Sequence, residues 1–388
     1  MTLPREVAVA VVGGGIVGLC TALELAREGM QVLVLDDAAR LGGTTVNAGS
    51  LHVQMQSRFI RMYPEQVPGL ERSLPLYTAA ARRWAELERE LGTSIELKSS
   101  GGLMVAETAE SYEFLARKCE REKRLGLQVE MFGRAELARV APYLGEAVVG
   151  AEFCAEEGKL NPLLANQAVR RALLALGSVI LPETRVEHLA PDPRGGWTLR
   201  TAAGELRAGR VVLAAGAGTG ALLAPLGLQV PTVAEPLHMN VTEAAAPLIG
   251  HLVQHAERMI TLKQLAAGQV VIGGGWPARL HGERQHPTVE ASSLIGNLRL
   301  ASHIVPQLAR LRLLRSWAGV NTTVDGQCVL GEVPGRPGLF TAVPGDAGYT
   351  LGPLVGRLAA GAVLGRRDLD FDIQPFSPGR FARAALLA

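Results

Sequence analysis

The residues of this chain most suited to binding a cofactor form a glycine-rich turn near the N-terminus. A continuous apolar run, Val7–Val12, is followed directly by Gly13-x-Gly15-x-x-Gly18. In this pattern the first glycine allows a tight turn, the second lets the backbone approach a pyrophosphate, and the third lets a helix pack on the strand. The free N–H groups and the dipole of the following helix favour negative charge. The turn therefore predicts a dinucleotide-binding site.

A carboxylate further along the chain supports this interpretation. A second apolar run, Gln31–Leu35, ends at Asp36, whose carboxylate can accept hydrogen bonds from both ribose hydroxyls. Strand, turn, helix and acid occur in the order of a βαβ unit, which is far more specific than the glycines alone. A secretory signal peptide is a poor alternative, because glycines interrupt the apolar stretch and Glu24 and Arg27 follow it.

Few other side chains have a pattern typical of a catalytic or metal site. His52 and His238 are candidates to face a substrate, although a lone histidine is more often a structural group. Tyr349 is a candidate to donate a hydrogen bond to a substrate, or to pack against a cofactor. His251 and His255 have the i,i+4 spacing of metal ligands without a further ligand nearby, so we expect no metal.

Composition limits the classes of protein that remain. The chain has 388 residues, 48% of them hydrophobic, which suits one large domain or two interleaved domains. A net charge of +2 gives no electrostatic case for nucleic-acid binding. The uncharged stretch Val211–Val230 contains too much glycine, proline and alanine for a good membrane span. The cysteines are too far apart to ligate an iron–sulfur cluster or zinc within the chain, and they suit a reducing compartment: Cys20, Cys119, Cys154 and Cys328. We therefore expect a soluble cytoplasmic protein.

Alternating strand and helix patterns must position the candidate residues. Small residues recur in four separated segments: the first turn, Leu41–Ser50, Val211–Ala217 and Gly345–Gly352. Helical patterns are expected at Ser73–Leu91, Thr108–Leu125, Asn161–Leu176, Glu290–Leu308 and Leu354–Leu364. Longer strands of an antiparallel sheet are expected at Val230–Thr242 and Ile260–Trp276. Nucleotide-type elements lie at both chain ends and in the middle, which predicts two interleaved domains of an α/β protein.

The small-residue segments resemble those of the D-amino-acid oxidase (DAO) family of FAD-dependent amine oxidoreductases. The matching segments are Gly13–Gly18, Asn47–Gly49, Val211–Gly216, Trp317–Gly319, Gly345–Leu351 and the C-terminal Phe376–Phe381. The resemblance spans the whole chain in the right order. Residues 47–52 and 348–353 are most similar to the β subunits of heteromeric opine, D-hydroxyproline and hydrogen-cyanide-type dehydrogenases.

The resemblance implies a Rossmann-like FAD-binding domain of the glutathione-reductase type, interleaved with an antiparallel-sheet α+β substrate domain. The expected FAD-binding domain comprises residues 1–75, 145–220 and 318–388, and the expected substrate domain comprises residues 76–144 and 221–317. FAD is expected to be non-covalent, because Ala318 stands where some relatives carry a flavin-linking cysteine.

The resemblance also assigns residues to the parts of the cofactor. The pyrophosphate and adenosine end would contact Gly13, Gly15, Ile16, Val17, Asp36, Asp37 and Val186. The flavin end would contact Thr44, Thr45, Asn47, Ala48, Gly49, Ala215, Gly216, Gly345, Gly348, Tyr349 and Thr350. One long ligand touched by backbone at several places explains why small residues cluster in separate segments.

The activity that the resemblance implies is oxidation of the carbon–nitrogen bond of a secondary-amine or D-amino acid, of the opine, D-hydroxyproline, D-proline or sarcosine class. Hydride would pass to flavin N5, and water would hydrolyse the resulting imine. The family's carboxylate ligands are absent, since Val320-Asn321 replaces the arginine of glycine-oxidase-like enzymes and Thr350 replaces the lysine of monomeric sarcosine oxidases. The remaining candidates are Arg58 first, then Arg61 and Arg258.

Three interpretations stay open. In the first interpretation, the chain is a dehydrogenase component. It would pass electrons to partner subunits carrying FMN or iron–sulfur centres, because it lacks cluster ligands of its own. Alternatively, it is a self-sufficient glycine or D-amino-acid oxidase that produces hydrogen peroxide, which a positive charge near the flavin, such as Lys263, would favour. The third interpretation is a non-catalytic flavin electron-transfer subunit. A nicotinamide dehydrogenase agrees less well, since one glycine-rich turn does not explain four small-residue segments.

Overall fold

The glycine-rich turn follows a central strand of a mostly parallel sheet. In the computed structural model, which describes residues 3–37, 42–282 and 285–384, the sheet order is β19-β20-β11-β1-β2-β8. Neighbouring strands on this path are parallel except β19 with β20, and β10 and β9 continue the sheet from β11 as an antiparallel extension. The strands are β1 (Glu6–Val12), β2 (Val32–Leu35), β8 (Val179–Leu181), β9 (Val186–Pro191), β10 (Trp197–Thr201), β11 (Gly204–Leu213), β19 (Val329–Glu332) and β20 (Leu339–Val343). Fully buried β2 and β20 are typical of parallel strands covered on both faces.

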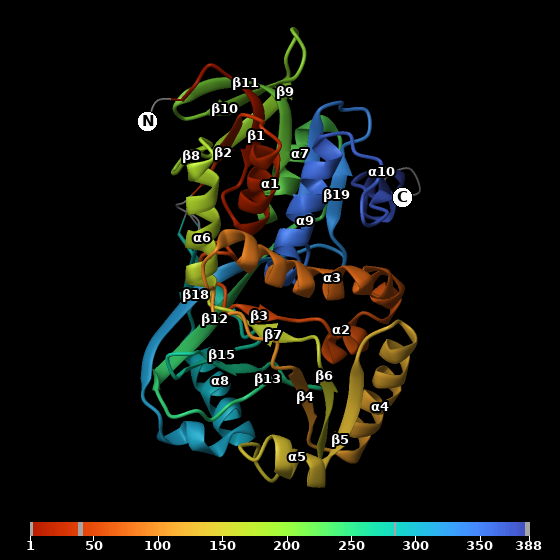
Figure 1. Ribbon diagram of the computed structural model, residues 1–388, viewed down its shortest axis with the longest axis vertical. Helices are drawn as coiled ribbons and strands as arrows, with labels where there is room; N and C mark the ends of the chain where they lie inside the picture. The colour runs from red at the N-terminus through yellow and green to blue at the C-terminus, as the bar shows by residue number, and fades with distance from the viewer. Residues whose placement is uncertain (1–2, 38–41, 283–284, 385–388) are drawn as a thin grey trace.

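Three helices pack together against this sheet, and a fourth crosses the junction between the two lobes (Figure 1). They are α1 (Ile16–Arg27), α6 (Pro162–Ala175), α9 (Gly348–Val363) and the crossing helix α3 (Val67–Leu91). Small residues let α1 and α9 approach closely, since a Cβ on Gly356 would lie 2.6 Å from the Cβ of Cys20. Asn161 caps α6 by accepting hydrogen bonds from the N–H groups of Leu163 and Leu164, and Pro162 occupies the first turn.

The second lobe is built on a large sheet that is antiparallel except where β13 pairs with β4. Its order is β18-β12-β15-β14-β13-β4-β6-β5. The strands are β4 (Gly102–Ala106), β5 (Val129–Gly133), β6 (Gly150–Cys154), β12 (Val233–Ala244), β13 (Leu252–His255), β14 (Thr261–Gln264), β15 (Gln269–Gly273) and β18 (Leu313–Thr323). Its core includes aliphatic residues from β4, β13, β14 and β15, which places an apolar face under the helices of this lobe.

Shorter elements complete both lobes. Two small ribbons pair β3 (Ser50–Leu51) with β7 (Gly158–Lys159), and β16 (Ala278–His281) with β17 (His286–Val289). The remaining α-helices of the described residues are α2 (Ser57–Met62), α4 (Ala109–Arg124), α5 (Arg134–Val140), α7 (Thr219–Leu223), α8 (Ala291–Ile304) and α10 (Gly379–Ala384). None of the helices in the described ranges combines the length and the apolarity needed to cross a bilayer.

The α/β class with interleaved parallel and antiparallel sheets is confirmed, and several boundaries differ from expectation. The expected long strand Ile260–Trp276 is a hairpin of β14 and β15, because Gly268 has φ +93° and turns the chain. Helix α9 begins at Gly348 rather than at Leu354, so part of the last small-residue segment is helical. Helix α3 begins at Val67, six residues before the expected start, and includes Pro75 in its interior.

Strands of the two sheets alternate along the chain. β1 and β2 belong to the first sheet, β4 to β6 to the second, β8 to β11 to the first, β12 to β15 and β18 to the second, and β19 and β20 to the first. The division into residues 1–75, 145–220 and 318–388 against 76–144 and 221–317 stays a prediction. Within it, β6 pairs in the second sheet and β18 spans the boundary at residue 318.

Candidate active site

The glycine-rich turn is closed by contacts that only glycine permits. Gly13 has φ +114°, and a Cβ there would lie 2.2 Å from the carbonyl oxygen of Ala214. A Cβ on Gly18 would lie 1.9 Å from the carbonyl oxygen of Gly13. Helix α1 starts directly after Gly15, which supplies no side-chain cap. The turn therefore leaves N–H groups of the first helical turn to be satisfied by something other than the helix.

Two side chains predicted to bind the cofactor lie at this turn. Asp36 accepts a hydrogen bond from the N–H group of Gly14 through Oδ1 (3.1 Å), and its Oδ2 lies 3.9 Å from Nη1 of Arg170. The hydroxyl of Thr44 accepts a hydrogen bond from the N–H group of Ile16 (2.9 Å). The structure thus brings Asp36 and Thr44 to the N-terminus of α1, as a dinucleotide site at this turn requires.

The other predicted cofactor residues come from several separate segments of the chain. Val17 is on α1, Asp37 lies 3.9 Å from Arg185, and Val186 is buried at the start of β9. Ala215 and Gly216 follow β11, and Gly49 and Gly345 adopt positive φ angles of 76° and 74°. Thr45 donates a hydrogen bond to the carbonyl oxygen of Gly42.

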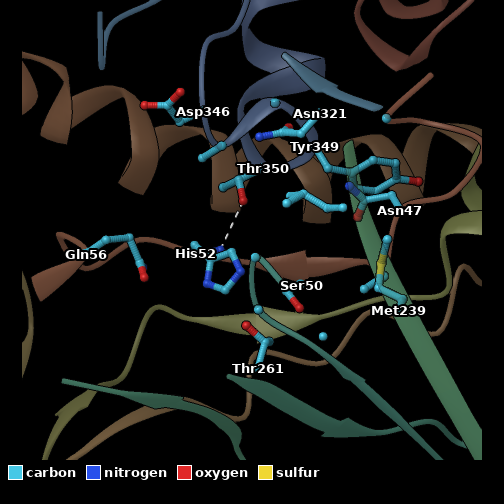
Figure 2. A pocket seen from close by; sticks show the side chains of 18 of the residues that line it. Asn47, Ser50, His52, Gln56, Met239, Thr261, Asn321, Asp346, Tyr349 and Thr350 are labelled. Atoms are coloured by element: carbon cyan, nitrogen blue, oxygen red, sulfur yellow. Dashed lines mark hydrogen bonds between the residues drawn. The ribbon is translucent and has the colours of Figure 1, made fainter. Parts of the chain in front are cut away.

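A cavity of about 310 Å³ lies between the first turn of α9, the segment 43–59 and strands of the second sheet (Figure 2). Seven predicted site residues line it: Asn47, Ala48, His52, His238, Gly348, Tyr349 and Thr350. Leu70, Leu74 and Tyr77 of α3 add an apolar wall. The cavity has the size and the mixed lining of a small-molecule site.

One buried lysine lies in the cavity wall. Lys263 on β14 is fully buried, and its Nζ donates a hydrogen bond to Oγ of Ser50 (3.2 Å). Burial lowers the pKa of Lys263 well below its ordinary value, and nearby Lys159 lowers it further. Among the described residues, Lys263 is the only lysine or arginine that lines the cavity. It is therefore the side chain of this lining best placed to become a cation when negative charge develops there.

Both candidate histidines lie in the cavity as neutral rings at pH 7. Burial and the nearby Lys263 lower the pKa of His52 to about 4, and its backbone N–H donates to Oγ1 of Thr350 (3.0 Å). Burial also lowers the pKa of His238. Nδ1 of His52 and Nε2 of His238 are buried without a hydrogen-bond partner among the described residues. Each ring therefore offers a polar atom to a ligand.

The hydroxyl of Tyr349 is engaged by α6 rather than left free for a substrate. It donates toward Oδ1 of Asn166 (3.0 Å) and the carbonyl oxygen of Pro162 (3.3 Å). The ring stacks on Trp84 with centroids 5.2 Å apart. Trp84 also donates from Nε1 to the carbonyl oxygens of Tyr349 and Thr350, both at 3.1 Å. These contacts favour a packing role for Tyr349.

The structure does not bring the candidate arginines to the cavity. Arg58 is half-buried on α2 and does not line it. Arg61 lies 3.6 Å from Glu257 and stacks over the ring of Phe114. Arg258 pairs with Glu107, which also contacts His255 (3.1 Å).

The pair His251 and His255 does not converge on a common point. His251 contacts the hydroxyl of Tyr143 at 2.8 Å, whereas His255 contacts Glu107. No group of three or more potential metal ligands occurs in the described part of the chain. The i,i+4 spacing reflects two separate structural contacts rather than a helix face, since His255 ends strand β13.

Several lining residues were not predicted from the sequence. Ser50, Gln54 and Gln56 line the cavity from the same extended segment as His52. Their spacing of two alternates with apolar positions from Leu51 to Met55, which is the period of an extended chain with one polar face. That alternation was the available signal. Further lining residues come from three distant segments and carry no such pattern: Thr261, Asn321 and Asp346.

The residues present fit a bound flavin nucleotide. The turn is closed by contacts that exclude side chains, and the cavity holds three buried polar atoms without partners among the described residues: Nδ1 of His52, Nε2 of His238 and Oδ1 of Asp346. Burial raises the pKa of Asp346 to about 6, with smaller contributions from Glu235 and Asp325. Segment 42–50 lies at the turn through Thr44 and at the cavity through Asn47, so one extended ligand can reach both.

Comparisons with known proteins agree with this geometry. Residues 8–362 match the family described as "FAD dependent oxidoreductase" (DAO). Glycine oxidase from Geobacillus kaustophilus is 29% identical over 95% of this chain and 96% of that protein. An opine oxidase component from Agrobacterium tumefaciens is 27% identical over 97% of this chain and 98% of that protein. The β subunit of sarcosine oxidase from Arthrobacter is 25% identical over 96% of this chain and 91% of that protein.

Solved structures share the fold over nearly the whole chain. The crystal structure of glycine oxidase from Geobacillus kaustophilus superposes with a TM-score of 0.84 at 26% identity, covering 97% of this chain and 99% of that chain. L-proline dehydrogenase from P. horikoshii superposes with a TM-score of 0.81 at 22% identity, covering 98% and 99%. At that lower identity the likeness is one of fold.

Proposed function

The chain belongs to the family of FAD-dependent oxidoreductases, and we propose that it oxidises the carbon–nitrogen bond of a secondary-amine or D-amino acid. The observation that supports this most directly is the cavity beside the segments expected to hold the flavin, with Lys263 and two neutral histidines in its wall. Bound FAD supplies the hydride acceptor. The opine, D-hydroxyproline, D-proline and sarcosine classes are the proposed substrates.

We propose that FAD binds without a covalent link. Gly13, Gly15 and Asp36 would hold the pyrophosphate and ribose at the start of α1. Asn47 and Gly348 would hold the flavin end beside the cavity. Ala318 on β18 offers no sulfur for attachment.

The cavity's own side chains suit an amine whose carboxylate is not held by arginine. His52 is neutral at pH 7, so its ring accepts or donates a hydrogen bond without adding charge. Gln56 offers its side-chain amide oxygen from the same segment, because its amide nitrogen donates to Gln254. Apolar residues of α3 exclude water from the facing side. A secondary amine with apolar bulk fits this lining better than a small, highly charged amino acid.

Anaerobic reduction of the bound flavin tests the proposal. The holoenzyme is mixed with D-proline, hydroxyproline, opines, sarcosine, glycine and D-alanine, and the loss of visible flavin absorbance is followed. We expect at least one secondary amine to bleach the flavin faster than glycine. A holoprotein that stays yellow with every amine would instead support the third interpretation, an electron-transfer protein without a substrate.

Two candidate functions differ in the electron acceptor, which is either a partner subunit or molecular oxygen. The similarity to components of opine oxidase and sarcosine oxidase supports partner subunits, which we propose carry FMN or iron–sulfur centres. Lys263 favours the second candidate, a self-sufficient oxidase, because a cation in the cavity wall stabilises negative charge on reduced oxygen. Oxygen uptake by the purified chain alone separates them.

The role of Lys263 is testable by substitution. We expect Lys263→Met to lower the rate of reoxidation by oxygen about a hundredfold, since losing one cation at close range removes roughly 3 kcal/mol of stabilisation. Flavin reduction by amine should change much less. Exposed Lys98 provides the control, and Lys98→Met should behave as wild type in stopped-flow reoxidation. Equal reoxidation rates in all three proteins would remove Lys263 from the oxygen reaction.

A further inference from the structure

A fully buried glutamate lies directly behind the cavity wall. Glu157 stands between β6 and β7 and is not exposed. Its Oε1 accepts hydrogen bonds from the backbone N–H groups of Val53 (2.8 Å) and Gln54 (3.2 Å). Its Oε2 accepts hydrogen bonds from the side-chain amides of Gln54 (2.9 Å) and Gln254 (2.8 Å). One carboxylate therefore binds two segments that are far apart in the sequence.

These contacts fix the polar side of the cavity. Val53 and Gln54 line it, and His52 precedes them. Gln254 extends the network, because its Oε1 accepts a hydrogen bond from Nε2 of Gln56 (2.8 Å), which also lines the cavity. Figure 2 shows His52 and Gln56 entering the cavity from the same segment. Without the carboxylate, residues 52–56 lose three hydrogen bonds, one from Val53 and two from Gln54.

The hydrogen bonds around Glu157 require its charged form. All four partners are N–H donors, so a protonated carboxyl would set an O–H group against a donor. Losing an acceptor for a buried donor is costly. The geometry of residues 52–56 is therefore coupled to the ionisation of a group that does not itself line the cavity.

The charges around Glu157 come mainly from α4 and β6. Lys118 on α4 donates to Oε1 of Gln54 (3.3 Å) and pairs with Glu122 (2.9 Å) and with Glu152 on β6 (2.7 Å). Burial raises the pKa of Glu157 to about 7, while the hydrogen bonds from Gln54 and Val53 and the charge of Lys118 oppose that rise. Burial also raises the pKa of the Cys154 thiol, so that group adds no charge near neutral pH.

We propose that Glu157 is a positioning residue whose ionised carboxylate holds residues 52–56 in the geometry that amine oxidation needs, and that its protonation sets the acidic limb of the pH–rate profile. The inference rests on the proposed function, because the rate is that of the same cavity. The carboxylate is ionised above its pKa and protonated below it, so the rate falls as pH falls through that value.

The variant Glu157→Gln tests the proposal against a matched neighbour. Glu156 is half-buried and accepts a hydrogen bond from the N–H group of Gln128, outside the cavity wall, so Glu156→Gln makes the same chemical change away from residues 52–56. We expect kcat/KM for anaerobic flavin reduction at pH 8.5 to fall about tenfold or more in Glu157→Gln, and its acidic limb to disappear. In wild type and in Glu156→Gln, kcat/KM should fall about tenfold for each pH unit below the pKa that sets the acidic limb.

Hydrogen exchange gives a readout that needs no activity. At one fixed pH, the amides of residues 52–56 in the FAD-loaded protein should exchange about tenfold faster in Glu157→Gln than in wild type or Glu156→Gln, because Val53 and Gln54 lose their charged acceptor. Unchanged exchange, or an acidic limb that persists in Glu157→Gln, overturns the proposal. So does an equal loss of rate at every pH, which is what a merely structural role predicts.

A second variant keeps the test open if Glu157→Gln does not fold. Gln254→Met removes one hydrogen bond to the charged carboxylate and leaves Glu157 in place, so the acidic limb should move to higher pH. A limb that does not move contradicts the proposal. If no amine reduces the flavin of the wild type, the proposed function fails, whereas the hydrogen-exchange comparison still decides the role of Glu157.

Discussion

The cavity wall pairs one lysine with rings that carry no charge at neutral pH. Lys263 is fully buried with Ser50 as its hydrogen-bond partner, and His52 titrates with a pKa of about 4 because burial and Lys263 both oppose its protonation. Negative charge appearing in the cavity would favour a protonated Lys263. These side chains suit a reaction in which negative charge develops in the cavity. They suit less well a reaction that begins with an ion pair between the substrate and the cavity wall.

The position of Arg58 leads to a prediction at the same scale. Because Arg58 lies on α2 outside the cavity lining, we expect Arg58→Ala to change the apparent substrate affinity less than about threefold, within what a surface substitution causes. The steady-state KM of Arg58→Ala tests the change in affinity, and its FAD content shows whether the cofactor is still bound. A rise in KM of about tenfold or more with FAD content intact would return Arg58 to the role of carboxylate ligand.

At the scale of elements, we propose that the first turn of α1 is where the cofactor's pyrophosphate binds. A Cβ on Gly15 would lie 3.1 Å from Oγ1 of Thr44, and a larger side chain would cover the N–H groups of the turn. We expect Gly15→Val to give folded protein without visible flavin absorbance. Gly133 precedes α5 with a similar conformation, φ −82° and ψ 174° against −74° and 176°, and no neighbour within 4 Å of an added Cβ. Gly133→Val should therefore stay yellow; a yellow Gly15→Val would refute the turn as the pyrophosphate site.

The junction of α3 with α9 positions one wall of the cavity. Trp84 on α3 is fully buried and donates to the carbonyl oxygens of Tyr349 and Thr350 in the first turn of α9. We expect Trp84→Phe to cost about 1–3 kcal/mol of stability, from the unsatisfied carbonyl groups, and to slow flavin reduction. Calorimetry and stopped-flow absorbance measure the two effects.

Trp197 provides the matched control for that substitution. It is 2% exposed on β10 of the first sheet and donates to the carbonyl oxygen of Pro337, which does not line the cavity. Trp197→Phe should lower the melting temperature comparably and leave the rate of flavin reduction unchanged. If both variants slow reduction equally, the loss reflects general destabilisation and not the position of α9.

At the scale of the whole molecule, strands of the two sheets alternate along the chain (Figure 1). The cavity draws residues from both lobes. A ligand that binds only the folded state stabilises it according to its concentration, by about 4 kcal/mol at roughly a thousand times its Kd. We expect removal of FAD to lower the melting temperature of both lobes together, and added FAD to restore it. Differential scanning calorimetry in which one lobe keeps its transition temperature without FAD would contradict this.

Local patterns were enough to predict the first βαβ unit and the fold class. The turn Gly13–Gly18, the strands beside it and Asp36 are close in the sequence, so their spacing fixes their geometry. The capped start of α6 at Asn161 and Pro162 was predictable for the same reason. The division of Ile260–Trp276 into β14 and β15 was missed, because the apolar pattern continues through the turn at Gly268.

The sequence by itself predicted a dinucleotide site, because the spacing of the first glycine-rich turn is local, and its resemblance to the FAD-dependent oxidoreductases, which spans the whole chain, predicted the family. Only the tertiary structure decided which polar side chains meet in the cavity. Glu157, Gln54 and Gln254 converge from three separate segments, whereas Arg58 lies two residues from the lining residue Gln56 and outside the cavity. The direction of a side chain is set by how its element packs, and neighbours along the chain do not reveal it.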